Sequence, residues 1–175
     1  MFGRQRDSSH GVESAVIVRR LVRTDAKVIG FLPALDRVAQ VLPPLLAAWA
    51  TTMADFVSGP IGVVPDWSTW TGSAGGTAVA DEQRPRLFSL LPPPCPDAAT
   101  ATPALMEAIS KHRAAFSRIL LNLSRYAASG HVPTAAEYVD GVAILVPTGR
   151  LRRSRLKNLV QDLDAGKNLG AILID

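Results

Sequence analysis

The sequence predicts an α/β fold with a mostly parallel sheet sandwiched by helices. Short, continuous apolar runs rich in Val, Ile and Leu are typical of strands that are covered on both faces. Such runs occupy residues 27–32, 60–65, 85–91, 118–123, 141–147 and 169–174. Helical patterns lie between these runs, and strands that alternate with helices are typical of parallel sheets.

The helices are expected at residues 36–56, 103–115, 133–138 and 151–163. Gly166 follows the last helix as a C-cap, so the chain turns into its last strand and completes a βαβ unit. Residues 1–12 are expected to form a flexible tail, and residues 66–83 a long loop rich in Gly, Ser and Thr. Residues 13–175 are expected to form one domain.

Composition excludes several classes of function. The chain has 175 residues and a net charge of +4 at pH 7, which is too small to indicate a nucleic-acid partner without a recognised reader motif. The single cysteine, Cys95, has no internal disulfide partner, and no apolar signal segment follows the basic first residues. We therefore expect a cytoplasmic protein that does not bind nucleic acid.

Neither a membrane-spanning helix nor a metal site is expected. The longest hydrophobic stretch, 41–64, is interrupted by prolines and an aspartate, so it divides into a helix and a strand. The three histidines are scattered and lack the spacing of metal ligands. We expect no cofactor.

Four segments together carry a family resemblance. They are "ESAVIVRRLVRTDAKVIGF", "PRLFSLLPPP", "FSRILLNLS" and "AAEYVDGVAILVPTGRLRRSRLKNLVQDLDAGKNLGAILID". In their order along the chain and their residue pattern, they resemble the kinase domain of bacterial tyrosine autokinases of capsule and exopolysaccharide export. These kinases are relatives of the MinD/ParA class of P-loop ATPases. The resemblance implies a P-loop NTPase-like fold in which the third segment corresponds to the Walker B strand.

The nucleotide-site positions depart from that family. A phosphate-binding loop needs glycines, a lysine for the phosphates and a hydroxyl for Mg²⁺. Here Gln40 stands near the lysine position, and Asn122 stands where the Walker B strand has its aspartate. The second strand offers Asp66, displaced by one position. The sequence therefore predicts a degenerate domain that has lost catalysis.

Two of these residues have simpler interpretations. For Asn122 we favour a strand-end residue that hydrogen-bonds a loop over a surviving catalytic role. Asp66 is either a turn former before "STW" or a remnant acid, and we favour the turn.

Three surface features are candidates for partner contacts. In the resembled kinases the N-terminal helix carries a Glu-x-x-Arg-x-x-Arg pattern used between subunits; here the spacing gives Glu13, Val16 and Arg19, with Arg20 and Arg23 nearby. We expect Val16, Ile17 and Leu21 to face the sheet, while Glu13, Arg20 and Arg23 face outward; an ordinary amphipathic surface helix has the same pattern. Two tryptophans in a polar loop, Trp67 and Trp70, suit contact anchors.

The third feature is a basic segment that includes Arg150, Arg152 and Arg153. Charge runs of this kind are usually solvated surface, which is our default interpretation. Because the segment follows the end of a strand, a site for an anion or an acidic partner is the alternative.

These observations predict a catalytically inactive kinase- or ATPase-like domain. The resemblance implies an interaction or regulatory role in bacterial exopolysaccharide, capsule or cellulose synthesis and export. The expected partner is a membrane-embedded component of that system, which would hold the protein at the inner membrane, and self-association is a further expectation. The alternative is an atypical nucleotide-binding ATPase of the MinD/ParA class.

Overall fold

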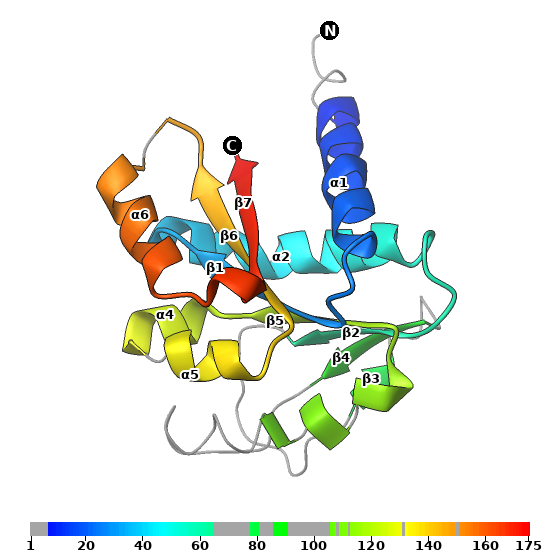
Figure 1. Ribbon diagram of the computed structural model, residues 1–175. Helices are drawn as coiled ribbons and strands as arrows, with labels where there is room; N and C mark the ends of the chain where they lie inside the picture. The colour runs from blue at the N-terminus through cyan, green and yellow to red at the C-terminus, as the bar shows by residue number, and fades with distance from the viewer. Residues whose placement is uncertain are drawn as a thin grey trace, which may run out of the picture.

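A computed structural model of the chain shows a sheet covered by helices on both faces (Figure 1). It describes residues 7–64, 78–80, 86–90, 106–107, 109–111, 113–130, 132–149 and 151–175. These residues form a seven-stranded sheet in the order β3-β4-β2-β5-β1-β6-β7. The β3–β4 pair is antiparallel, and every other neighbouring pair in the described residues is parallel. The predicted α/β class and the mostly parallel sheet are confirmed.

The strand bounds agree closely with the apolar runs of the sequence. The strands are β1 (Val28–Pro33), β2 (Ile61–Val64), β3 (Ala78–Ala80), β4 (Leu87–Leu90), β5 (Arg118–Asn122), β6 (Gly141–Pro147) and β7 (Asn168–Ile174). All residues of β1 and β6 are buried, because these strands lie inside the sheet and helices cover both of its faces.

One face of the sheet is covered by α1 (Asp7–Val22) and α2 (Asp36–Met53) (Figure 1). The buried residues of α2 recur at helical spacing, which makes one continuous apolar stripe against the sheet. They are Val38, Leu42, Leu46, Trp49, Ala50 and Met53. The Trp49 ring lies 5.4 Å from the Phe31 ring of β1 between centroids, so α2 is anchored over the central strand.

The opposite face carries α4 (Ser124–Ser129), α5 (Val132–Glu137) and α6 (Arg153–Gln161) (Figure 1). A hydrophobic cluster on this face of the sheet contains the buried residues Tyr126, Val132 and Ala135. Residues 106–107 and 109–111 are helical, and Arg113–Ala115 forms a 3-10 turn before β5. A second 3-10 turn, Ala165–Lys167, leads from α6 into β7.

Four details differ from the sequence prediction. Helix α1 begins at Asp7, so residues 7–12 are helical rather than part of a tail. Strand β3 lies within the segment predicted to be a loop, and α4 was not predicted. Val16 does not face the sheet: it is 63% exposed, and Val18 is buried instead.

None of the helices in the described part of the chain is long and apolar enough to cross a membrane.

Candidate functional site

The candidate site is the edge of the sheet where β1, β5, β6 and β7 have their carboxyl ends. In open α/β sheets, ligands bind in the crevice outside the carboxyl ends of the strands. Strand β1 lies between β5 and β6, so the first residues after β1 lie beside the end of β5. This arrangement brings the β1–α2 connection and Asn122 to one edge.

The connection from β1 to α2 is short. Strand β1 ends at Pro33 and α2 begins at Asp36, so Ala34 and Leu35 are the whole connection and neither is a glycine. Both residues are held by the surrounding backbone: Ala34 N–H donates to the Leu145 carbonyl of β6 at 2.9 Å, and the Leu35 carbonyl accepts from Val38 N–H at 2.9 Å. A loop that wraps a phosphate needs several successive free N–H groups, and this connection has no length for them.

The first turns of α2 carry side chains unlike those of a phosphate site. The acidic residue Asp36 lies in the first turn, where its charge complements the helix dipole and repels a bound anion. Gln40, the predicted lysine position, is exposed and already lies inside α2. The neutral amide of Gln40 supplies no charge to a phosphate.

Asn122 is the last residue of β5 and is only 1% exposed. Its Oδ1 accepts hydrogen bonds from Ser124 N–H at 2.9 Å and from Ser124 Oγ at 2.6 Å. This is the contact expected of a strand-end residue that hydrogen-bonds a loop, and it fixes the start of α4. The Nδ2 group of Asn122 is buried without a hydrogen-bond partner in the described residues. The end of β5 therefore presents a donor where a metal would need an acceptor oxygen.

A hollow of about 410 Å³ lies farther along the same edge. It is lined by residues from the start of α2 and from the ends of β6 and β7, among them Arg37, Thr148 and Asp175. The Thr148 hydroxyl donates to Asp175 Oδ1 at 2.7 Å, which ties the ends of β6 and β7 together. Arg37 is the cationic group of this hollow, and sequence reasoning missed it because it lies outside any recognised motif.

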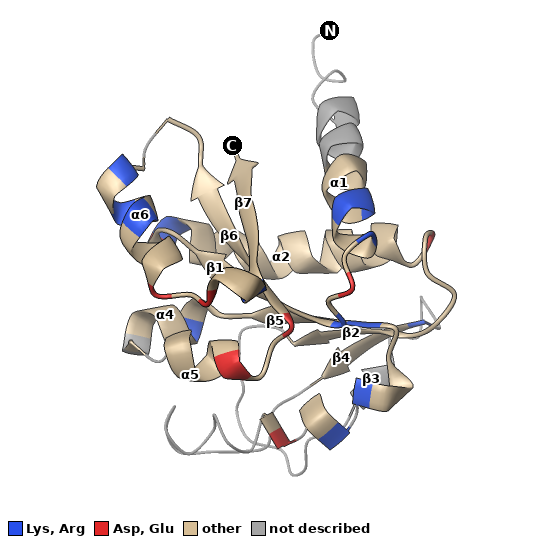
Figure 2. Cartoon of the chain, viewed as in Figure 1, with Lys and Arg blue, Asp and Glu red and all other residues tan. Residues whose placement is uncertain are grey.

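The predicted interface residues of α1 have different surroundings. The Arg19 guanidinium lies 5.4 Å from the centroid of the Phe56 ring, so this arginine makes a cation–π contact within the chain. Arg20 and Arg23 are exposed. Glu13 is one of the residues of α1. Figure 2 shows the basic residues of α1 in the half of the helix nearer the sheet.

The basic residues of α6 are exposed, as expected of a solvated surface. Arg152 precedes the helix and Arg153 begins it, and neither side chain hydrogen-bonds another residue that the structure describes. Four of the sequence-predicted site residues, Asp66, Trp67, Trp70 and Arg150, lie outside the described residues.

A carboxylate that the site prediction did not include lies at the opposite edge of the sheet. Asp140 Oδ2 accepts from Lys27 N–H at 2.9 Å and Val28 N–H at 2.8 Å, and its Oδ1 pairs with Arg113 at 2.6 Å. Burial alone would raise the pKa of Asp140, but the hydrogen bonds from Val28, Arg113 and Lys27 and the Arg113 charge hold it below the usual value. Asp140 clamps the start of β1 and does not belong to the ligand edge.

No group of His, Cys, Asp and Glu side chains suited to a metal ion occurs within the ranges that the structure describes.

The fold is shared with solved kinase and ATPase structures. The chain is similar to the VpsO kinase domain, with a TM-score of 0.72 and 18% identity over 96% of this chain and 95% of that one. It is similar to the BceF tyrosine kinase domain, with a TM-score of 0.68 and 12% identity over 91% of this chain and 73% of that one. A ParA family ATPase from Chlorobium tepidum TLS has a TM-score of 0.50 and 12% identity over 84% of this chain and 73% of its own.

No protein-family profile and no curated protein matches the sequence. The structural similarities confirm the predicted resemblance at the level of the fold. The chain therefore has the P-loop-like α/β fold found in tyrosine kinase domains and in a ParA family ATPase.

Proposed function

We propose that this domain is a catalytically inactive relative of kinase and ATPase domains that works through its surfaces. The observation that carries the proposal is the β1–α2 connection, in which Ala34 and Leu35 replace the glycine-rich loop. In P-loop proteins, successive backbone N–H groups and a lysine bind the phosphates of a nucleoside triphosphate. Without them, the phosphates would lose contacts worth about 1.5–3 kcal/mol each, because hydrogen bonds to charged groups are the strong ones.

The end of β5 supports the same proposal. Phosphoryl transfer in this class uses a carboxylate to hold Mg²⁺ beside the phosphates. Asn122 supplies a neutral amide whose oxygen is already bonded to Ser124. A metal ion at this position would have to displace both hydrogen bonds and would gain no charge in return.

The sequence resemblance supports a proposal for the cellular role. We assign the domain to bacterial exopolysaccharide, capsule or cellulose synthesis and export, as a cytoplasmic interaction or regulatory component. A domain without catalysis must act through contacts, so the expected partner is a protein, and a membrane-embedded component of the export system would hold the domain at the inner membrane. Neighbouring genes for glycosyltransferases and a chain-length protein would support this assignment, and their absence would count against it.

One observation favours the second candidate function, an atypical nucleotide-binding ATPase. The hollow beside Arg37 lies at the ligand edge of the sheet, and its volume of about 410 Å³ is large enough for part of a nucleotide. An ATPase of this kind would depend on the Arg37 charge in place of the missing lysine.

A turnover assay separates the two functions. Purified protein is incubated with Mg-ATP, and phosphate release and phosphotyrosine are measured. Of the two tyrosines in the sequence, Tyr126 is buried and Tyr138 is 43% exposed, so Tyr138 is the residue to examine for modification. The proposal predicts no turnover above a buffer control. Phosphate release that Arg37→Ala abolishes would overturn the proposal and establish the ATPase.

A further inference from the structure

The open edge of the sheet at β7 has the main-chain chemistry of a docking site. Among the described residues β7 pairs only with β6, so its outer side keeps unpaired peptide N–H and C=O groups. Proteins usually protect such an edge with lysine or proline, and the sequence of β7, NLGAILI, contains neither. A bulge at Leu169, next to Gly170 with φ of 100°, leaves Ala171 to Ile174 in regular register with β6.

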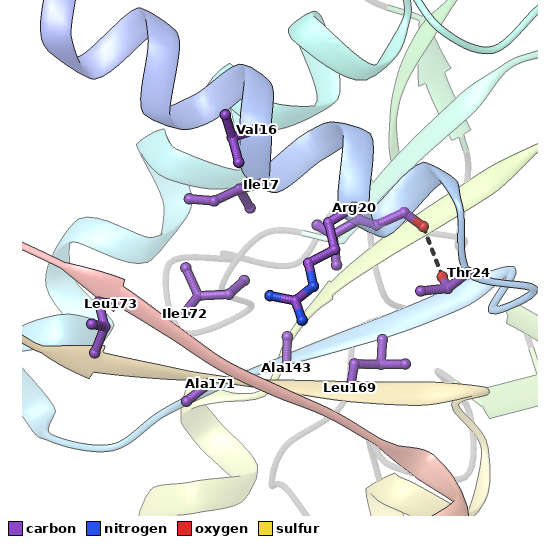
Figure 3. Close-up of a pocket in the computed structure, with 10 residues that line it drawn as sticks. Val16, Ile17, Arg20, Thr24, Ala143, Leu169, Ala171, Ile172 and Leu173 are labelled. Atoms are coloured by element: carbon purple, nitrogen blue, oxygen red, sulfur yellow. Dashed lines mark hydrogen bonds between the residues drawn. The ribbon is translucent and has the colours of Figure 1, made fainter.

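Beside this edge lies a groove between α1 and β7, which we name the α1–β7 groove (Figure 3). Val16 of α1 is 63% exposed and lines the groove. Ile172 of β7 lies across from it, because Ile172 pairs with Leu145 and packs on the face of the sheet that α1 and α2 cover. The partly buried Ile17 and Ile172 lie beside the exposed Val16, so the groove has an apolar lining. Its volume is about 210 Å³, below the range of about 300–1,000 Å³ typical of small-molecule pockets, so it suits one or two side chains.

Arg20 gives the groove its charge. Figure 3 shows its side chain extending from α1 into the groove toward Ala143 and Ile172. Its guanidinium has no hydrogen-bond or ion-pair partner among the residues that the structure describes, and no acid lines the groove. A guanidinium between apolar walls pairs most favourably with a carboxylate. The occupant must therefore combine apolar side chains with an acid.

We propose that the α1–β7 groove binds an extended, acidic and apolar segment of a partner protein. The segment adds to the edge of β7 as a further strand, places an apolar side chain between Val16 and Ile172, and pairs a carboxylate with Arg20. This inference rests on the proposed function as an interaction domain and specifies the chemistry of the partner.

A second copy of the chain suits the groove less well. Two copies joined at their β7 edges would be related by a two-fold axis, so each contact would occur twice. Arg20 and the neighbouring exposed Arg19 and Arg23 of both copies would then approach one interface, where the groove lining offers no acid to offset them. The charge therefore favours an acidic partner.

Short peptides that alternate valine or isoleucine with glutamate test the proposal. Binding is followed by fluorescence polarisation and by the amide resonances of β7 in NMR spectra. The glutamate peptides should bind and shift the Ala171 to Ile174 amides, whereas peptides with lysine in place of glutamate should not. Arg20→Glu and Val16→Asp should each weaken binding at least about tenfold. Arg155→Glu, at an exposed position of α6 on the opposite face of the sheet, is the matched control and should leave binding unchanged.

Equal binding of lysine and glutamate peptides, no binding of either, or no shift at β7 would overturn the proposal. A dimer of the free chain that Val16→Asp dissociates would also overturn it, in favour of a second copy as the occupant. ATP turnover is measured on the same variants. Turnover with intact peptide binding would overturn only the proposed inactivity, whereas lost peptide binding without turnover would overturn only the docking site.

Discussion

Asn122 differs from an aspartate at the end of β5 by one group, an NH2 in place of an oxygen. An amide and a carboxylate have nearly the same shape, but the amide offers one acceptor and one donor group. The acceptor, Oδ1, is satisfied by Ser124, and the donor, Nδ2, is buried without a partner in the described residues. The residue thus stabilises the start of α4 while leaving no oxygen free for Mg²⁺.

Asn122→Asp should lower the free energy of unfolding by about 1–3 kcal/mol near neutral pH. One carboxylate oxygen would keep the bonds from Ser124, and the other would replace Nδ2 in a buried position without a donor. The loss should become smaller in acid, where the new carboxyl group is protonated. Urea denaturation measures the effect, and Asn158→Asp at an exposed position of α6 is the control. Equal stability of Asn122→Asp and wild type would contradict this description of the site.

Asp140 should make stability depend on pH. Its folded pKa lies below the ordinary value, so its contribution is fully present above the unfolded pKa, near 3.9, and is lost as pH falls through the folded pKa. The stability difference between wild type and Asp140→Asn should therefore be constant from about pH 5 to 7 and shrink below about pH 4. Denaturation at a series of pH values measures it. Asp55→Asn, at an exposed position, is the control, and a pH-independent difference for Asp140→Asn would refute the clamp.

At the scale of elements, the sequence predicts what burial on both faces dictates. Strands β1, β5 and β6 could be predicted from their apolar sequences, because a central parallel strand that is covered on both faces is apolar along most of its length. Helix α4 was missed because six residues are too few to show helical periodicity, and β3 because its three residues lie in a Gly- and Thr-rich segment.

Only Val16 was placed incorrectly in the predicted orientation of α1, since Ile17 and Leu21 face the core as expected. The buried stripe of α1 contains Val18 and Leu21, with Ile17 partly buried, at spacings of three and four residues. Val16 lies one turn before Arg20, on the side that borders the α1–β7 groove. An apolar residue in a helix does not reveal whether its neighbour is the sheet or an open groove, so the groove was not predictable from the sequence.

The β1–α2 connection should prevent rescue of activity by side chains alone. The double substitution Gln40→Lys and Asn122→Asp restores the lysine and the acid, but Ala34 and Leu35 still provide no glycine-rich turn. We expect no ATP hydrolysis in a phosphate-release assay. The folded state of the double variant is checked by circular dichroism, and robust turnover by a folded variant would count against this explanation.

The arginines of α1 should differ in what they stabilise. Arg19→Ala should cost about 0.5–1 kcal/mol, because it removes an exposed cation–π contact with Phe56. Reversing the charge of Arg19, Arg20 and Arg23 together should preserve the fold and weaken self-association or partner capture. Thermal unfolding measures the first effect, and analytical ultracentrifugation with partner pull-down measures the second. Unchanged assembly in both assays would exclude α1 as an interface.

At the scale of the whole molecule, the fold does not by itself determine the chemistry. The sheet and its covering helices have the fold of solved kinase and ATPase structures, and the similar VpsO structure matches nearly the entire chain. Fold-level similarity does not establish activity, which depends on groups at the ligand edge. At that edge the described residues offer a short connection, an acidic first helical turn and a buried amide. The sequence predicted the loss of the lysine and the acid, whereas the shortness of the connection became visible only in the structure.

Isothermal titration calorimetry with Mg-ATP tests the absence of a nucleotide site most directly. A folded protein, verified by a cooperative thermal transition, should give no binding heat above dilution, and ATP should not raise its unfolding temperature, because a ligand stabilises only the state that it binds. Dissociation in the micromolar range or tighter, accompanied by measurable phosphate release, would contradict the account and identify the domain as an active nucleotide-binding enzyme.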